Sequence, residues 1–76
     1  MDELDLVVLL RDIPAHGLLR GDVGTIVHRY ADDQALEVEF VTAAGGTVAV
    51  VTLDLANVRP VGAHDLLHVR ELISAG

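Results

Sequence analysis

The sequence contains no cysteine and no tryptophan, and none of its five basic residues is a lysine. Without cysteine the chain forms neither disulfide bonds nor thiolate metal sites, which suits a reducing compartment. Tyr30 and Phe40 are the only tyrosine and phenylalanine. Two rings are too few for the aromatic groove with which signalling SH3 domains bind proline-rich peptides.

Membrane and export signals are also missing. No apolar run approaches the roughly 18 residues that a membrane-spanning helix needs. Three of the first five residues are acidic, whereas a signal peptide begins with basic residues. We therefore expect a cytoplasmic protein without membrane contact, and its 76 residues allow a single domain.

Positive charge is scarce, since twelve acidic residues against five basic ones give a net charge of −7. Affinity for nucleic acid comes largely from lysine and arginine side chains that neutralise phosphates. The charge therefore argues against nucleic acid as a partner and favours a basic protein.

Aliphatic side chains, in contrast, are abundant. The chain is 51% hydrophobic but only 3% aromatic. These side chains exceed what one small core needs, and surplus apolar surface on a small domain usually forms an interface. We expect a homo-oligomer.

Short apolar stretches separated by turn residues predict five strands. Gly24, near the start of the second strand, indicates a bulge or a close backbone approach. Residues 54–57 are typical of a single helical turn before the last strand. The predicted strands are Leu6–Leu10, Val23–Tyr30, Leu36–Phe40, Thr47–Leu53 and Val58–Val61.

The fourth predicted strand is apolar on both faces. Alternation places Ala49, Val51 and Leu53 on one face. Val48 and Val50 then lie on the other face. A strand of this kind needs a second cover, either the C-terminal tail or another subunit.

The C-terminal residues have helical periodicity from Ala63 to Ile73. A helix of about three turns is marginal alone and must dock on another surface. We therefore divide the chain into residues 1–61, a barrel, and residues 62–76, a helical tail. The predicted interface combines apolar residues of the fourth strand and the tail: Val48, Val50, Leu66, Val69, Leu72 and Ile73.

Five short strands, a bent second strand and a helical turn before the last strand predict a mainly β fold, a small five-stranded SH3-like barrel with a short C-terminal helix. The segment Gly21–Val27 is similar to the opening motif of the barrel in KOW-type modules and in the C-terminal part of the nitrile hydratase β subunit.

A longer resemblance covers residues of about 4 to 61. The chain resembles domain of unknown function 4926, a family of short, acidic, mainly bacterial proteins. The resemblance implies an SH3-like fold and brings no catalytic residue. Members of the family are encoded beside toxin-like proteins, which implies an antitoxin- or immunity-like role. The tail after Val61 departs from the family pattern. The matching motifs are Asp12–Leu18, Gly21–Val27, Glu37–Phe40 and Val58–Val61.

Catalytic and metal-binding residues are few. On a helix, His64 and His68 would share one face, with Glu71 near it as a third ligand. A solvated polar helix face explains these residues better. Ser74 is the only serine and lies two residues from the end. We expect no enzyme, no cofactor and no resident metal.

These observations favour a non-enzymatic, self-associating protein-interaction module with an antitoxin- or immunity-like role. Two alternatives remain open. One is a KOW-like module bound to RNA or the ribosome, and the other is a metalloenzyme assembly factor with a barrel similar to that of nitrile hydratase.

Overall fold

A computed structural model describes residues 1–32 and 34–72 of the chain. All five predicted strands are confirmed, with ends that shift by at most one residue. The turn predicted before the last strand is confirmed as a 3₁₀ turn, η2 (Leu55–Asn57), and a second one, η1 (Pro14–His16), follows β1. The strands are β1 (Leu6–Leu9), β2 (Val23–Arg29), β3 (Ala35–Val41), β4 (Thr47–Asp54) and β5 (Val58–Pro60).

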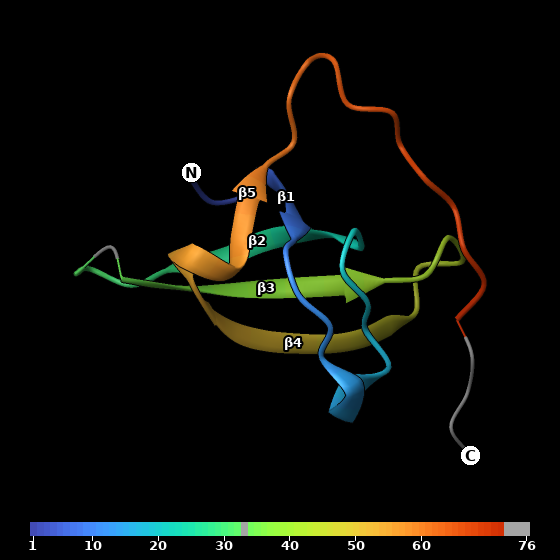
Figure 1. Ribbon diagram of the computed structural model, residues 1–76. Coiled ribbons are helices and arrows are strands. Elements are labelled where there is room, and N and C mark those ends of the chain that lie inside the picture. The colour runs from blue at the N-terminus through green and yellow to red at the C-terminus, as the bar shows by residue number, and fades with distance from the viewer. Residues whose placement is uncertain (33, 73–76) are drawn as a thin grey trace.

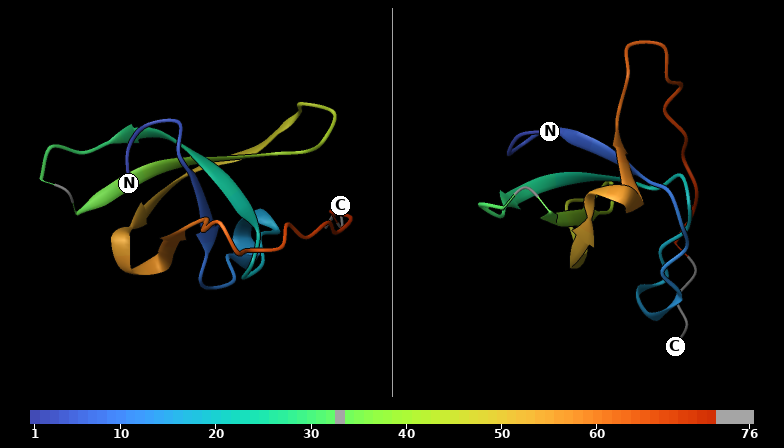
Figure 2. Two further views of the ribbon diagram at one scale, coloured as in Figure 1. Left: turned by 90° about the horizontal axis from the view of Figure 1, so that it is seen from above. Right: turned by 60° about the vertical axis from the view of Figure 1, so that its left-hand side comes forward.

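The strands form one antiparallel sheet in the order β4-β3-β2-β1-β5. The sheet is strongly curved, and β5 crosses β3 and β4 at a steep angle (Figures 1 and 2). The mainly β prediction is therefore confirmed. The sheet is not closed, however, because no pairing joins β4 to β5 in the described part of the chain. Strand β5 has only three residues and ends at Pro60, which lacks a backbone N–H donor.

The core lies on the concave side of the curved sheet. Alternating side chains of β3 point into it, so Leu36, Val38 and Phe40 are buried while the glutamates between them face outward. All strands contribute to this core, and Leu18 closes it from the β1–β2 connection. The other buried members are Val7, Leu9, Ile26, Leu53 and Val58.

Gly24 permits a close approach between β2 and β3, one of the two alternatives predicted for it. A Cβ atom at this position would lie 2.5 Å from Val38 Cγ1 and 3.0 Å from the Glu39 carbonyl oxygen. Backbone and core would both have to move, so only glycine fits here. The irregular register of β2 lies further along, between Ile26 and His28.

A second irregularity changes which face of the sheet a side chain of β4 lies on. The register of β3 against β4 shifts between Phe40 and Val41. This bulge turns Val48 toward the core, against which it packs partly buried, whereas Val50 is 50% exposed on the outer face. The prediction that both valines share the outer face is therefore wrong for Val48.

The predicted C-terminal helix is not formed. Apart from a turn at residues 63–64, the chain from 61 to 72 has no regular secondary structure, and Ile73 lies outside the described residues. The tail swings away from β5 in a wide arc and returns beside the β3–β4 hairpin (Figure 1). A short helix has little intrinsic stability. Here ion pairs of Asp65 and Arg70 with the sheet domain hold the segment in an open path instead.

In the described part of the chain, no helix is long and apolar enough to cross a membrane.

Candidate functional site: the β4 edge and the tail groove

Strand β4 forms one border of the sheet and, among the described residues, pairs only with β3. Leu55 N–H donates to the Gln34 carbonyl oxygen at 3.4 Å, at the end of this ladder. Backbone groups alternate in direction along an antiparallel strand. The N–H and C=O groups of Val51 therefore face β3, and those of Val50 and Thr52 face away from the sheet.

This border, the β4 edge (residues 47–53), carries only one of the usual devices that prevent strands from pairing. Its seven residues include no charged residue, proline or glycine. Natural proteins protect exposed edges with short strands, lysine, proline or bulges. Only the bulge at Val48 is present, and it lies at one end of the edge.

Two outer-face carboxylates of β3 lie beside this edge, since Glu39 is the cross-strand partner of Val50 and Glu37 that of Thr52. Thr47 Oγ1 donates to Glu39 Oε2 at 3.0 Å, and the Thr52 hydroxyl donates to Glu37 Oε1. The carboxylates therefore bind neighbouring hydroxyl groups. Val50 remains as the apolar centre of the edge.

Tyr30 extends this polar arrangement, since its hydroxyl donates to Glu37 at 2.9 Å and its ring meets His28 edge to face at 4.8 Å. Hydrogen bonds from Thr52 and then Tyr30 lower the pKa of Glu37, and the bond to Glu37 raises the pKa of Tyr30. Two hydroxyl groups thus hold one oxygen of the ionised glutamate, Oε1, in place.

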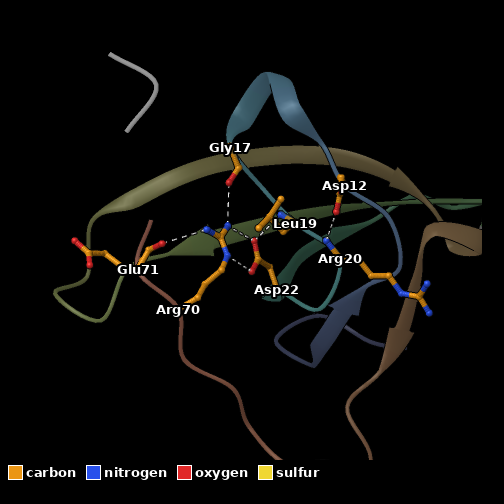
Figure 3. Close-up of polar contacts among 7 residues, drawn as sticks. All are labelled: Asp12, Gly17, Leu19, Arg20, Asp22, Arg70 and Glu71. Atoms are coloured by element: carbon orange, nitrogen blue, oxygen red, sulfur yellow. Dashed lines mark hydrogen bonds and ion pairs between the residues drawn. The ribbon is translucent and has the colours of Figure 1, made fainter. Parts of the chain in front are cut away.

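The second surface lies where the tail returns to the β1–β2 connection, next to the Val48 end of the β4 edge. Arg70 binds Asp22 through two parallel contacts, Nε to Oδ1 at 2.8 Å and Nη2 to Oδ2 at 2.6 Å. Nη2 also donates to the Gly17 carbonyl oxygen at 2.9 Å (Figure 3). Both charged side chains are largely buried, with 23% of Arg70 and 17% of Asp22 exposed. Bidentate pairs of this kind are directional and strong.

A backbone hydrogen bond within its own turn holds the Asp22 side chain in position for this contact. Its Oδ2 accepts the Leu19 N–H at 2.8 Å, which fixes the turn. Arg20 N–H donates to Asp12 Oδ1 at 2.8 Å, and the Arg20 side chain points away from Asp22 (Figure 3). The hydrogen bond from Arg70 is the main cause that lowers the pKa of Asp22, and the Leu19 N–H acts in the same direction.

Beside this ion pair runs a groove of about 320 Å³ between the tail and the sheet, the tail groove. Leu18, Phe40 and Val48 give it an apolar wall. Leu72 enters from the tail side, and its Cδ1 lies so near Gly17 that an added Cβ there would be 3.7 Å away. Gly17 has a φ of +68°, a left-handed conformation that favours glycine.

The remaining predicted interface residues lie on the exposed arc of the tail. Leu66 is 96% exposed, Val69 92% and Leu72 40%. The tail therefore presents apolar side chains to solvent, and of these residues Val69 and Leu72 line the groove.

The weak metal candidates His64, His68 and Glu71 depended on a helix. Because the segment is not helical, their spacing places them on no common face. Within residues 1–32 and 34–72, no group of three or more histidine, cysteine, aspartate or glutamate side chains could hold a metal ion. Ser74 lies outside the described residues.

Sequence reasoning missed the Arg70–Asp22 pair. Gly21-Asp22 indicates a turn, and no local pattern connects it with an arginine 48 residues away. The signal that was present is the composition: in a tail rich in apolar residues, Arg70 is the one arginine after Val61.

Taken together, the molecule is a small antiparallel β domain with an open edge and a tail fastened by an arginine. The family described as Domain of unknown function (DUF4926) matches residues 3–60. The chain therefore belongs to this family, which confirms the resemblance found in its sequence. Comparisons with curated proteins and with solved structures found no match.

Proposed function

We propose that this chain is a non-enzymatic protein-interaction module that self-associates through its β4 edge. The observation that carries the proposal is the set of outward backbone groups along the seven uncharged residues 47–53 of β4. An exposed, apolar edge strand is a template for another strand, and main-chain hydrogen bonds then supply the affinity.

A second copy of β4 is the occupant that best matches this edge. Two copies related by a twofold axis at Val50 would run antiparallel and pair over residues 47–53. No charged residue would then face a like charge within the paired strands. Each Val50 side chain that is buried would contribute about 1.5–3 kcal/mol.

Several finer features belong to the same proposal. The strand order and the 3₁₀ turn before β5 support an SH3-like description of the sheet. Small size and a net charge of −7 suit an antitoxin- or immunity-like role in the cytoplasm, with a basic protein as a further partner. The exposed tail residues Leu66 and Val69 stay a predicted second contact.

The alternative of an RNA-associated module has less support. Three of the five arginines, Arg29, Arg59 and Arg70, form ion pairs with carboxylates of the chain itself. Their charge is therefore less available for phosphates, on which RNA affinity depends.

The test is the particle mass by light scattering over a range of protein concentrations. Val50→Lys should lower the mass to that of one chain, since lysine on an edge opposes strand pairing. The variant also reduces the net negative charge, so added charge repulsion would not explain the loss. Leu66→Lys, measured in the same assay, shows how much the tail contributes to self-association.

Val27→Lys is the matched control. Val27 is 40% exposed on β2, an interior strand, so the same charge change lies away from the edge. This variant should keep the mass of the wild-type chain. A wild-type protein that remains a monomer, or an equal loss in both variants, would contradict self-association through β4.

A further inference from the structure

The tail groove has the chemistry of an arginine-recognition site that the chain fills with its own tail. Two carboxylate oxygens of Asp22 and the Gly17 carbonyl oxygen converge on one guanidinium group. The planar guanidinium group matches such a set of acceptors, whereas the ammonium group of lysine cannot bind bidentately. An apolar wall for a second side chain lies beside this set.

The two halves of the contact come from different parts of the chain. Gly17 and Asp22 lie within the residues that match the family, 3–60, whereas Arg70 lies beyond them. The recognition half is therefore part of the family domain itself. The occupant is an added segment.

The tail is held in a way that allows it to leave. Between the turn fixed by Arg59–Asp65 and the clamp at Arg70, residues 66–69 make no hydrogen bond that the structure describes. Leu66, Leu67 and Val69 are 72–96% exposed along this arc. No member of the buried core comes from the tail in the described part of the chain, so release of Arg70 leaves the core intact.

Release would leave acceptors that need a new donor. Asp22 Oδ1 and the Gly17 carbonyl oxygen would both lose Arg70, and these groups are part-buried. Part-buried acceptors favour a replacement partner over an empty site. A net charge of −7 on the chain further attracts a cationic segment.

We propose that the tail groove binds an extended segment of a basic partner protein, in which an arginine is followed two residues later by an apolar side chain. Arg70 and Leu72 show this spacing in the bound tail. The tail thus occupies the groove in cis and competes with the partner. This inference rests on the proposed role as an interaction module and names a second partner for it.

The test uses the full chain with Arg70→Ala and Val50→Lys, which opens the groove and removes self-association. The probe is a capped peptide with the sequence of residues 66–72. Its binding is followed through the amide chemical shifts of the protein in NMR spectra. We expect saturable shifts at Gly17, Leu19 and Asp22 at peptide concentrations of about 1 mM or below. With Arg70 present, binding should be at least about threefold weaker, because the tethered tail competes at a high effective concentration.

Changes in the peptide serve as controls that cannot affect folding. Replacing its arginine by lysine should weaken binding about tenfold, and replacing it by alanine should abolish saturation. On the protein, Asp22→Asn should abolish binding while the melting temperature stays near that of the parent, since an asparagine still accepts the Leu19 N–H.

Absence of saturable shifts, or an equal response to the alanine peptide, would overturn the proposal. Neither outcome affects the test of self-association, which compares the particle masses of the wild-type chain and of its Val50→Lys and Val27→Lys variants. If the chain is a monomer but binds the peptide, the proposed β4 dimer is wrong and the proposed site in the tail groove is upheld.

Discussion

The two edges of the sheet differ in every property that governs strand pairing. Strand β4 offers seven consecutive residues without charge, proline or glycine, whereas β5 has three residues, of which two are Arg59 and Pro60. The Arg59 guanidinium is further held by Asp65, at 2.8 and 3.0 Å, beside β5. One border is therefore blocked by length, proline and charge, and the other is open. The contrast places the proposed contact on β4.

A proline scan of β4 would have the largest effect on this comparison. Val51→Pro removes an N–H that faces β3, and the loss of that hydrogen bond with its unsatisfied acceptor should cost about 2–4 kcal/mol. Small domains have only about 5–15 kcal/mol of stability, so this variant should be close to unfolding. Urea denaturation followed by circular dichroism measures the difference.

Val50→Pro is the matched variant, because its N–H faces away from the sheet. Proline is tolerated at such edge positions, and the free energy of unfolding of the monomer should change by less than about 1 kcal/mol. Association should nevertheless be lost. If Val50→Pro destabilises the monomer as much as Val51→Pro does, the assigned direction of the β4 backbone is wrong.

A smaller effect concerns the charged border at β5. The hydrogen bond from Arg59, with a second one from the Gly62 N–H, lowers the pKa of Asp65 to about 2. Because the pKa in the folded state lies below the ordinary value of 3.8, this pair stabilises the fold above that value. The contribution is lost as the pH falls through about 2.

The carboxyl carbon resonance of Asp65, followed by NMR from neutral pH into acid, measures this pKa. Arg59→Ala should raise the midpoint toward the ordinary aspartate value, with the Gly62 hydrogen bond keeping part of the shift. The mass of the particle should not change, since β5 takes no part in the proposed pairing. An unchanged midpoint would show that Arg59 does not hold Asp65 beside β5.

The sheet was predictable because its signals are local. Alternation in Leu36–Phe40, turn residues between strands and the glycine at position 24 each act through a few neighbouring residues. The bulge that turns Val48 inward could not be predicted from the sequence, because it depends on how β3 and β4 register against each other. Alternation counted through a bulge assigns the wrong face to the residues beyond it.

The tail shows the opposite limit of sequence reasoning. Leu66, Val69 and Leu72 have helical spacing, but periodicity predicts a helix only where a surface receives its apolar face. Here Arg70 contacts Asp22, 48 residues away, and this contact sets the path of the segment. Of the two proposed surfaces, Val50 was therefore predicted from the sequence and the arginine site was not.

Amide hydrogen exchange at Val50 and Val51 tests the central claim most directly. The Val51 N–H, which faces β3, should be protected at every protein concentration. The Val50 N–H should exchange quickly in dilute solution and become protected as the mass doubles, because a strand of the second copy then covers it. Rapid exchange at Val50 in a sample whose mass is that of a dimer would contradict pairing through β4.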